Sequence, residues 1–206
     1  MKILMAAAEN DAMPKGKVGG IGDVVRDIPI ALANIGQQVD VVMPGYGYFS
    51  KLAEATHITS LQVMFANQLQ SIDIYKVSIE NASSGVSQWV IEHPLFAVGG
   101  EGKIYCDDPD NRPFASDATK FALFSAAVAK AIICDVFGNI DVLHLHDWHT
   151  AMISVLRAYE PEFQQLKAIK TVYTIHNLAL QGIRPIEGDE SSLKAWFPNL
   201  PFELEQ

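Results

Sequence analysis

The sequence predicts an α/β fold of the Rossmann-like, doubly wound type, with a mainly parallel sheet and a β-rich insertion. Short apolar runs alternate with stretches of helical periodicity at the start of the chain and again from residue 114 onward. Such alternation is typical of β-α-β units and of a parallel sheet. Between these two parts, three runs with strand character follow one another without a helix. This succession indicates an antiparallel insertion or an extension of the sheet.

The first β-α-β unit occupies the opening part of the chain. A short apolar run at residues 2–7 predicts a buried strand, and a polar, glycine-bearing loop follows over residues 9–22. Apolar residues then recur at helical spacing, and Gly36 follows where a helix end favours left-handed backbone. Pro29 lies inside this pattern and removes a helical hydrogen-bond donor, so we expect a kink or a lost hydrogen bond there. The next strand is predicted at residues 39–43.

The rest of the chain divides into the insertion and a second parallel part. Strands are predicted at residues 61–66, 72–79 and 86–92, with a turn over residues 81–85. Residues 99–113 are rich in Gly, Asp, Pro and Asn, which indicates an irregular surface loop. The predicted second parallel part comprises a buried, alanine-rich helix (114–134), a strand (142–146), a helix (150–159), a strand (171–176) and a short amphipathic piece (193–197).

Composition and charge narrow the class of protein. With 15 basic and 24 acidic residues the net charge is -9, which disfavours a nucleic-acid partner. No stretch approaches the roughly 20 apolar residues that a membrane span needs, and the first apolar run ends at Glu9, too early for a signal peptide. The only cysteines, Cys106 and Cys134, form neither a disulfide framework nor a metal motif. We therefore expect a soluble, cytoplasmic protein without a nucleic-acid or membrane partner.

Polar residues gather where three predicted parallel strands end, which is where open α/β sheets bind ligands. In the first of these segments, Gly19 and Gly20 precede a helix whose N-terminus attracts anions, and Lys17 adds a positive charge. The alternative is a flexible turn with a solvated lysine. The loop lacks the third glycine of a dinucleotide fingerprint and the Gly-Lys-Ser/Thr of a P-loop. Simple NAD binding and ATP hydrolysis therefore lose support.

The second segment contains His144, His146 and His149, together with Asp147 and Trp148. Three imidazoles and a carboxylate suit zinc. The usual hydrolase pattern, however, places the aspartate directly before the last histidine, whereas Trp148 intervenes here. We therefore predict that these residues form no metal site. Buried, hydrogen-bonded structural histidines are the other interpretation.

The third segment presents His176 and Asn177 as they emerge from an apolar run. An imidazole and an amide supply donors and acceptors that suit a hydroxyl-rich ligand. Taken alone the segment is weak evidence, because His176 also fits a hydrogen-bonded core histidine.

Together the three segments resemble the glycogen and starch synthase family. They read Lys-x-Gly-Gly-hydrophobic-Gly-Asp-Val-Val, His-x-His-Asp-Trp-His and Thr-Ile-His-Asn-Leu-Ala-x-Gln-Gly, in this order, and the resemblance extends over nearly the whole chain. It implies that residues 1–206 form the first of the two Rossmann-like domains of a GT-B transferase, whose C-terminal nucleotide-binding domain is absent. The implied reaction transfers glucose from ADP-glucose or UDP-glucose to the non-reducing end of an α-1,4-glucan. It retains the anomeric configuration and needs neither metal nor cofactor.

The resemblance also implies roles for individual residues. The chain departs from the family pattern at Val18, where threonine is usual, and at Leu180, where tyrosine is frequent. His149 receives no role. The implied roles are catalysis for His176 and Asp147, donor binding for Lys17, Gly19, Gly20, Asp23 and Asn177, and contact with acceptor or donor for Tyr105 and Trp148.

These implications lead to two expectations and leave alternatives open. We expect Lys17, Asp147 and His176 to line one cleft. We expect this chain alone to transfer no glucose, because the family's C-terminal domain supplies an arginine, a lysine and a glutamate that hold the diphosphate. The partners would be the nucleotide sugar, the glucan and that C-terminal domain. The alternatives are another retaining GT-B transferase such as a sucrose-synthase or trehalose-forming relative, a non-catalytic glucan-binding or regulatory module, and a metallohydrolase.

Overall fold

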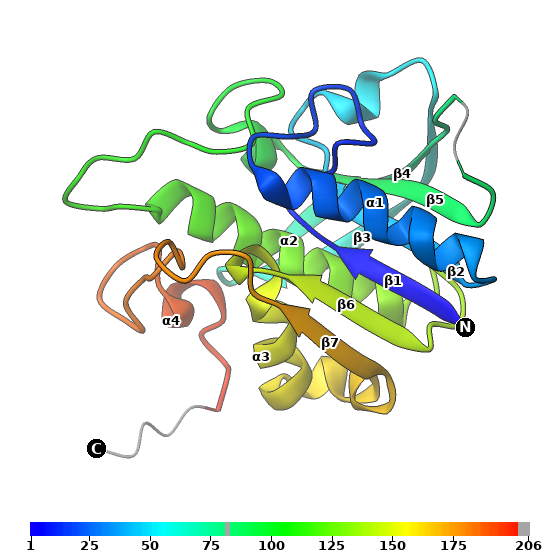
Figure 1. Ribbon diagram of the computed structural model, residues 1–206. Coiled ribbons are helices and arrows are strands. Elements are labelled where there is room, and N and C mark those ends of the chain that lie inside the picture. Colours follow the sequence, from blue (N-terminus) through cyan, green and yellow to red (C-terminus); the bar gives the residue numbers. More distant parts are fainter. Residues whose placement is uncertain (81–82, 202–206) are drawn as a thin grey trace.

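The computed structural model describes residues 1–80 and 83–201, and Figure 1 shows a twisted sheet with helices on both faces. In this part of the chain a seven-stranded sheet has the order β3-β4-β5-β2-β1-β6-β7. In each pair of neighbouring parallel strands, the residue pairing runs without a register shift. The parallel strands are β1 (Lys2–Ala6), β2 (Gln38–Pro44), β5 (Val86–Glu92), β6 (Val142–His146) and β7 (Lys170–Thr174).

Two further strands extend the parallel sheet as an antiparallel hairpin. Strand β4 (Gln68–Val77) pairs antiparallel with both β5 and the edge strand β3 (Ala55–Phe65). Ala66 and Asn67 join the hairpin with φ of 51° and 59°, as a tight type I′-like turn requires. The β-rich insertion is therefore confirmed as a sheet extension. Its first strand begins at Ala55 rather than at residue 61. The sequence did not predict the added residues, because they are mostly polar and exposed and carry no apolar alternation.

Helices cover both faces of the parallel strands. Helix α1 (Gly20–Asn34) packs on one face, whereas α2 (Ala115–Ile133) and α3 (Ala151–Tyr159) cover the other. Along β1 the side chains alternate, so that Ile3 and Met5 join the core under α1 while Leu4 and Ala6 join the core under α2 and α3. The doubly wound class is confirmed.

Details of the helices follow the sequence closely. Pro29 lies inside α1, which continues to Asn34, and Gly36 has the left-handed φ of 81° that was predicted. The alanine-rich α2 is buried along most of its length. No helix in the described ranges is long and apolar enough to cross a bilayer. The short helices are η1 (Phe49–Lys51), η2 (Pro94–Ala97), η3 (Trp148–Thr150), η4 (Pro161–Ala168) and α4 (Leu193–Trp196).

One predicted segment ends earlier in the structure, and another lies partly outside the described residues. Strand β7 ends at Thr174 rather than at residue 176, so His176 lies in the loop beyond the sheet. Of the turn predicted over residues 81–85, positions 81 and 82 lie outside the described residues. Gly85, at its end, has a φ of 92°, which favours glycine.

Candidate functional site

A cavity of about 760 Å³ lies beyond the carboxyl ends of β1, β6 and β7. This volume falls in the range of small-molecule sites. Its wall is built by Glu9, by residues 18–21 at the start of α1, by residues 105–108, 113, 114 and 117, and by residues 147–149, 176, 177 and 180. Seven of the nine predicted site residues are among the lining residues: Gly19, Gly20, Tyr105, Asp147, Trp148, His176 and Asn177.

The start of helix α1 is held by a buried carboxylate. Gly19 is the N-cap residue and provides no side-chain cap. Instead Glu9, 2% exposed, accepts hydrogen bonds of 2.7 Å at Oε2 from the backbone N–H groups of Val18 and Gly19. The next amides along the helix start, those of Gly20 and Ile21, belong to the first turn and therefore have no carbonyl partner within the helix. They also lie in the cavity wall.

Sequence reasoning missed Glu9, and one of its predictions changes as a result. Gly19 was expected to offer its amide to a ligand, but that amide already donates to Glu9. The remaining backbone donors at this point are those of Gly20 and Ile21. A signal was available, because Glu9 is the carboxylate that closely follows the first strand, at the edge of the sheet where such folds bind ligands.

Tyr105 connects Glu9 to His149. The Tyr105 hydroxyl donates to Glu9 Oε1 at 2.7 Å and lies 3.2 Å from His149 Nε2. Burial, followed by the nearby Glu9 charge, raises the pKa of Tyr105, so the phenol keeps its proton. Burial lowers the pKa of His149 to about 3, so this imidazole is neutral. Since the phenol proton goes to Glu9, His149 donates from Nε2 to the Tyr105 oxygen. His149, to which the family resemblance gave no role, therefore holds Tyr105 in place through this hydrogen bond.

The segment that contains Tyr105 is anchored to helix α2 by a buried ion pair. Lys120 is fully buried and pairs with Asp117 at 2.7 Å, while its ammonium also donates to the Ile104 carbonyl. Asp117 in turn accepts a hydrogen bond of 3.0 Å from the Cys106 backbone N–H. Tyr105 lies between Ile104 and Cys106, which are both anchored, so its ring has little freedom to leave the cavity wall.

Asp147 ties the end of β6 to the end of β7. Its backbone N–H donates to the Thr174 carbonyl at 2.8 Å, and its carboxylate accepts from the Trp148 N–H at 3.0 Å. Burial raises the pKa of Asp147, although the hydrogen bond from Trp148 acts in the opposite direction. Its φ of 57° is unusual for a residue with a side chain. Backbone strain of this kind gathers at functional sites.

Trp148 forms an aromatic part of the cavity wall. Its ring meets those of Phe114 and Phe121 edge to face, with centroids 5.7 Å and 5.4 Å apart. On another side the backbone at Gly182 approaches the indole so closely that a Cβ there would lie 2.1 Å from Cε3. The indole is therefore held in one position between α2 and the segment after β7.

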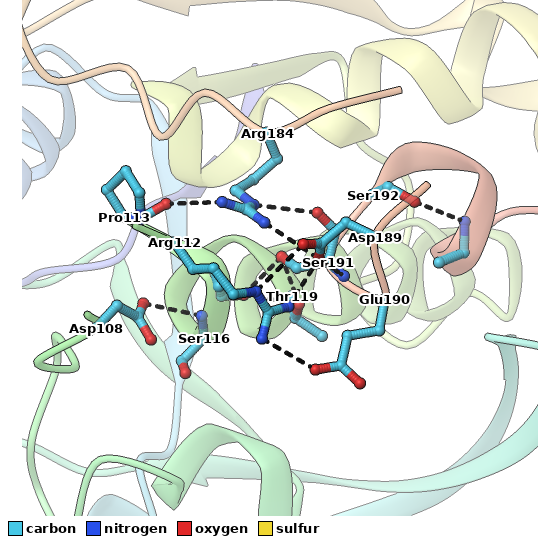
Figure 2. Close-up of polar contacts among 12 residues, drawn as sticks. Asp108, Arg112, Pro113, Ser116, Thr119, Arg184, Asp189, Glu190, Ser191 and Ser192 are labelled. Atoms are coloured by element: carbon cyan, nitrogen blue, oxygen red, sulfur yellow. Dashed lines mark hydrogen bonds and ion pairs between the residues drawn. The ribbon is translucent and has the colours of Figure 1, made fainter. Parts of the chain in front are cut away.

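An ionic network braces this wall from outside, as Figure 2 shows. Arg112 donates to both carboxylate oxygens of Asp189, at 3.2 and 2.7 Å, and also pairs with Glu190. Arg184 pairs with the same Asp189 at 3.1 Å and donates to the Pro113 carbonyl. The network joins the loop before α2 to the segment after β7. No local pattern predicted the contacts that join the two segments, because Arg112 and Asp189, and likewise Pro113 and Arg184, are more than 70 positions apart in the sequence.

Three of the histidines, His144, His146 and His176, lie in a row. His146 Nδ1 is 2.8 Å from His176 Nε2, and His144 Nε2 is 2.8 Å from Thr174 Oγ1. Burial lowers the pKa of His144 and lowers that of His146 to about 3. Among residues 1–80 and 83–201, no group of three or more His, Cys, Asp or Glu side chains is arranged to hold a metal ion.

Comparison with known proteins agrees with this architecture. A family model described as the starch synthase catalytic domain matches residues 2–206. The chain belongs to this family. Glycogen synthases of Gloeobacter violaceus and Caldicellulosiruptor bescii are each 35% identical to it, over 88% and 91% of this chain and 34% and 36% of their own lengths. The chain thus spans about a third of the length of the curated relatives it matches.

A solved structure supports the same assignment at the level of the fold. The catalytic domain of starch synthase IV from Arabidopsis thaliana, bound to ADP and acarbose, superposes with a TM-score of 0.68 at 26% identity. The match covers 88% of this chain and 34% of the plant chain. The mixed sheet and its flanking helices are therefore those of a GT-B domain of the starch synthase family.

Two residues that the family pattern suggests for donor binding lie outside the cavity wall. The Lys17 ammonium is 2.6 Å from the Asp23 carboxylate, and Arg26 lies 3.4 Å from the same group. The hydrogen bond to Asp23 raises the pKa of Lys17. The expected common cleft therefore contains Asp147 and His176, whereas Lys17 flanks it, because Asp23 holds its side chain at the exposed edge of the loop.

Proposed function

We propose that this chain is the N-terminal half of a glucosyltransferase that elongates an α-1,4-glucan. Glucose passes from ADP-glucose or UDP-glucose to the 4-hydroxyl at the non-reducing end of the glucan, and the anomeric configuration is retained. The C-terminal domain of the longer protein closes the other side of the cleft. No metal or further cofactor takes part in the proposed reaction.

The observation that carries this proposal is the meeting of a helix N-terminus with hydroxyl-binding side chains in one cavity. The free amides of Gly20 and Ile21 lie at the positive end of α1, where an anion is stabilised. His176 and Asn177 line the same cavity and offer polar groups to sugar hydroxyls. Trp148 adds an aromatic surface against which a sugar ring can pack.

These groups suit a transfer in which negative charge develops on a leaving diphosphate. Preorganised donors aimed at that charge accelerate such a step, because they are stronger in the transition state than in the ground state. The amides of Gly20 and Ile21 supply donors of this type from the chain itself. His176 and Asp147, beyond the carboxyl ends of β7 and β6, orient the glucosyl group.

The charge of the cavity wall explains why the chain alone is proposed to be inactive. Among the described residues that line the cavity there is no lysine or arginine, whereas the wall carries several carboxylates. A diphosphate would meet net repulsion here, so the missing cations must come from elsewhere in the longer protein. Lys17 flanks the predicted donor site, and it reaches a ligand only by leaving Asp23. The carboxylates in the wall are Glu9, Asp107, Asp108, Asp117 and Asp147. Asp107 is paired with Lys103 and Asp117 with Lys120, so that, among the described residues, Glu9, Asp108 and Asp147 carry the charge that no lysine or arginine offsets.

The test is transfer of labelled glucose from ADP-glucose, and separately from UDP-glucose, into glycogen. We compare the 206-residue chain with a fusion of this chain to the C-terminal two thirds of the Gloeobacter violaceus glycogen synthase. We expect incorporation only with the fusion, with the α-anomeric product seen by proton NMR. Equal activity of the short chain would overturn the half-enzyme proposal, and an inactive fusion beside an active parent enzyme would overturn the assigned function.

A matched pair of variants tests the donor loop within the fusion. Lys17→Ala removes the cation beside the helix start, and we expect a loss of at least tenfold in kcat/KM for the nucleotide sugar. Lys15→Ala removes a lysine from the same loop, whose ammonium lies over the Tyr48 ring, 5.4 Å from its centroid, and which does not line the cavity. Equal effects of the two substitutions would contradict a specific role for Lys17.

A further inference from the structure

The contact between His146 and His176 bears on which ring nitrogen of His176 carries a proton. His146, on β6, is fully buried. Its ring lies nearly parallel to that of His176, with an interplanar angle of 18° and centroids 5.1 Å apart. The hydrogen bond runs between His146 Nδ1 and His176 Nε2 over 2.8 Å. Only one of these two nitrogens can be the donor when both rings are neutral.

The other nitrogen of His146 decides the direction. His146 Nε2 is buried and has no hydrogen-bond partner among the described residues. If the proton were on Nε2, a buried N–H would have no acceptor, and such orphaned donors are rare in folded proteins. An unprotonated Nε2, whose lone pair meets no donor, is tolerated more easily at this position. Burial, which lowers the pKa of His146 to about 3, disfavours a ring with both protons. The proton therefore lies on Nδ1 and is donated to His176.

The acceptor side of this bond then fixes the state of His176. Because its Nε2 accepts, a neutral His176 carries its proton on Nδ1. His176 lines the cavity, and its Nε2 is engaged with His146, so Nδ1 is the ring nitrogen left for a ligand. We propose that His146 is a positioning residue that holds His176 as the Nδ1–H tautomer, so that the cavity offers its ligand a hydrogen-bond donor.

The surroundings of the pair hold this geometry in place. The His144 ring packs on His146 with centroids 4.2 Å apart, and His144 itself is bonded to Thr174 on β7. Asp147 donates its own backbone N–H to the Thr174 carbonyl at 2.8 Å. The ends of β6 and β7 are thus locked side by side.

The ligand that this donor recognises is an oxygen with a free lone pair. Under the proposed function, on which only this part of the inference rests, that oxygen is a hydroxyl of the transferred sugar. The lone pair of a sugar oxygen accepts the Nδ1–H, whereas an Nε2–H tautomer would instead present a bare nitrogen and would require the sugar hydroxyl to donate.

The experiment reads the tautomer directly, in the 206-residue chain with 15N-labelled histidine. Long-range 1H–15N correlation spectra at pH 7.5 separate protonated from bare ring nitrogens, and the spectrum of His176→Gln assigns the resonances. We expect Nδ1 of His176 to be the protonated nitrogen and Nε2 the bare one. A protonated Nε2 on a neutral His176 would overturn the inference, and this measurement needs no variant of His146.

Two substitutions of His146 then test its influence. His146→Leu removes the donor, and we expect His176 to lose its single Nδ1–H state and to populate the Nε2–H tautomer. His146→Asn places an amide N–H near the position of the original Nδ1–H, and we expect it to restore the Nδ1–H state. An unchanged His176 tautomer in a folded His146→Leu chain would show that His146 does not set it.

Activity of the fusion separates the two proposals. We expect kcat/KM to fall at least tenfold with His146→Leu and to recover in part with His146→Asn. A correct tautomer in an inactive fusion would refute the proposed function and leave this inference intact. The opposite tautomer in an active fusion would refute this inference alone.

Discussion

Gly182 is the position at which one added methyl group should disturb the cavity most directly. A Cβ at Gly182 would lie 2.1, 2.3 and 2.5 Å from three atoms of the Trp148 indole, far inside van der Waals contact. The ring cannot retreat easily, because Phe114 and Phe121 pack against it. We therefore expect Gly182→Ala to displace Trp148 or the segment after β7, or both.

The magnitude follows from two separate effects. Gly182 has a φ of 59°, and a left-handed backbone costs a residue with a side chain roughly 1–2 kcal/mol. Overpacking adds typically about 1–3 kcal/mol. Gly188 gives a matched control, because its φ is 82° while no atom lies within 4 Å of a Cβ built there. Gly188→Ala should therefore show the backbone effect alone.

The assay is urea unfolding of the chain and of both variants, together with near-ultraviolet circular dichroism of the indoles. We expect Gly188→Ala to lose about 1–2 kcal/mol of unfolding free energy and Gly182→Ala to lose about 2–5 kcal/mol, with an altered indole spectrum. Equal losses in the two variants, with unchanged spectra, would refute the packing of Gly182 against Trp148.

Three further predictions concern the buried polar groups. Glu9→Ala should lower the unfolding free energy by about 1–3 kcal/mol, because the amides of Val18 and Gly19 and the hydroxyl of Tyr105 lose a buried acceptor, whereas Glu9→Gln keeps one oxygen and should lose less in the same urea titration. Lys120→Met should lose about 3–5 kcal/mol by leaving Asp117 unpaired, and adding Asp117→Leu should recover part of that loss; a double variant worse than the single would contradict it. The free energy of unfolding should fall as the pH drops from 6.5 toward 4, by up to about 2.7 kcal/mol per pH unit. In the folded chain burial lowers the pKa of His146 and of His149 to about 3, whereas in the unfolded chain these histidines take up protons near pH 6.5. His149→Gln should reduce that slope, measured by urea unfolding at several pH values, and a flat profile would contradict the prediction.

The elements of the fold could be predicted where the information is local. The alternation of apolar runs and helical periodicity placed the parallel strands and α2, and Gly36 marked the end of α1 through its left-handed φ. The start of β3 could not be found this way. Its first residues are mostly polar and exposed at the sheet edge, and they form a strand because they pair with β4.

The site could be predicted only from the rule that the carboxyl ends of parallel strands meet at one edge of a sheet. That rule brought Asp147, Trp148 and His176 together, although they come from separate segments. It could not show that Glu9 occupies the Gly19 amide, since that contact depends on how a loop folds back over the strand end. It also could not show that Lys17 turns toward Asp23, because two opposite charges six positions apart pair only when the loop and helix have formed.

The position of Glu9 has a consequence for the direction from which an anion approaches. An anionic side chain at the start of a helix is itself favourable, so Glu9 stabilises α1 while it satisfies the Val18 and Gly19 amides. The same charge repels a phosphate from those amides and leaves the amides of Gly20 and Ile21 as the helix donors still open to it. Because the described cavity wall supplies no cation to offset Glu9, a diphosphate is held only when positive side chains face it from across the cleft. The proposed dependence on a second domain therefore follows from the charge of this wall as well as from the length of the chain's relatives.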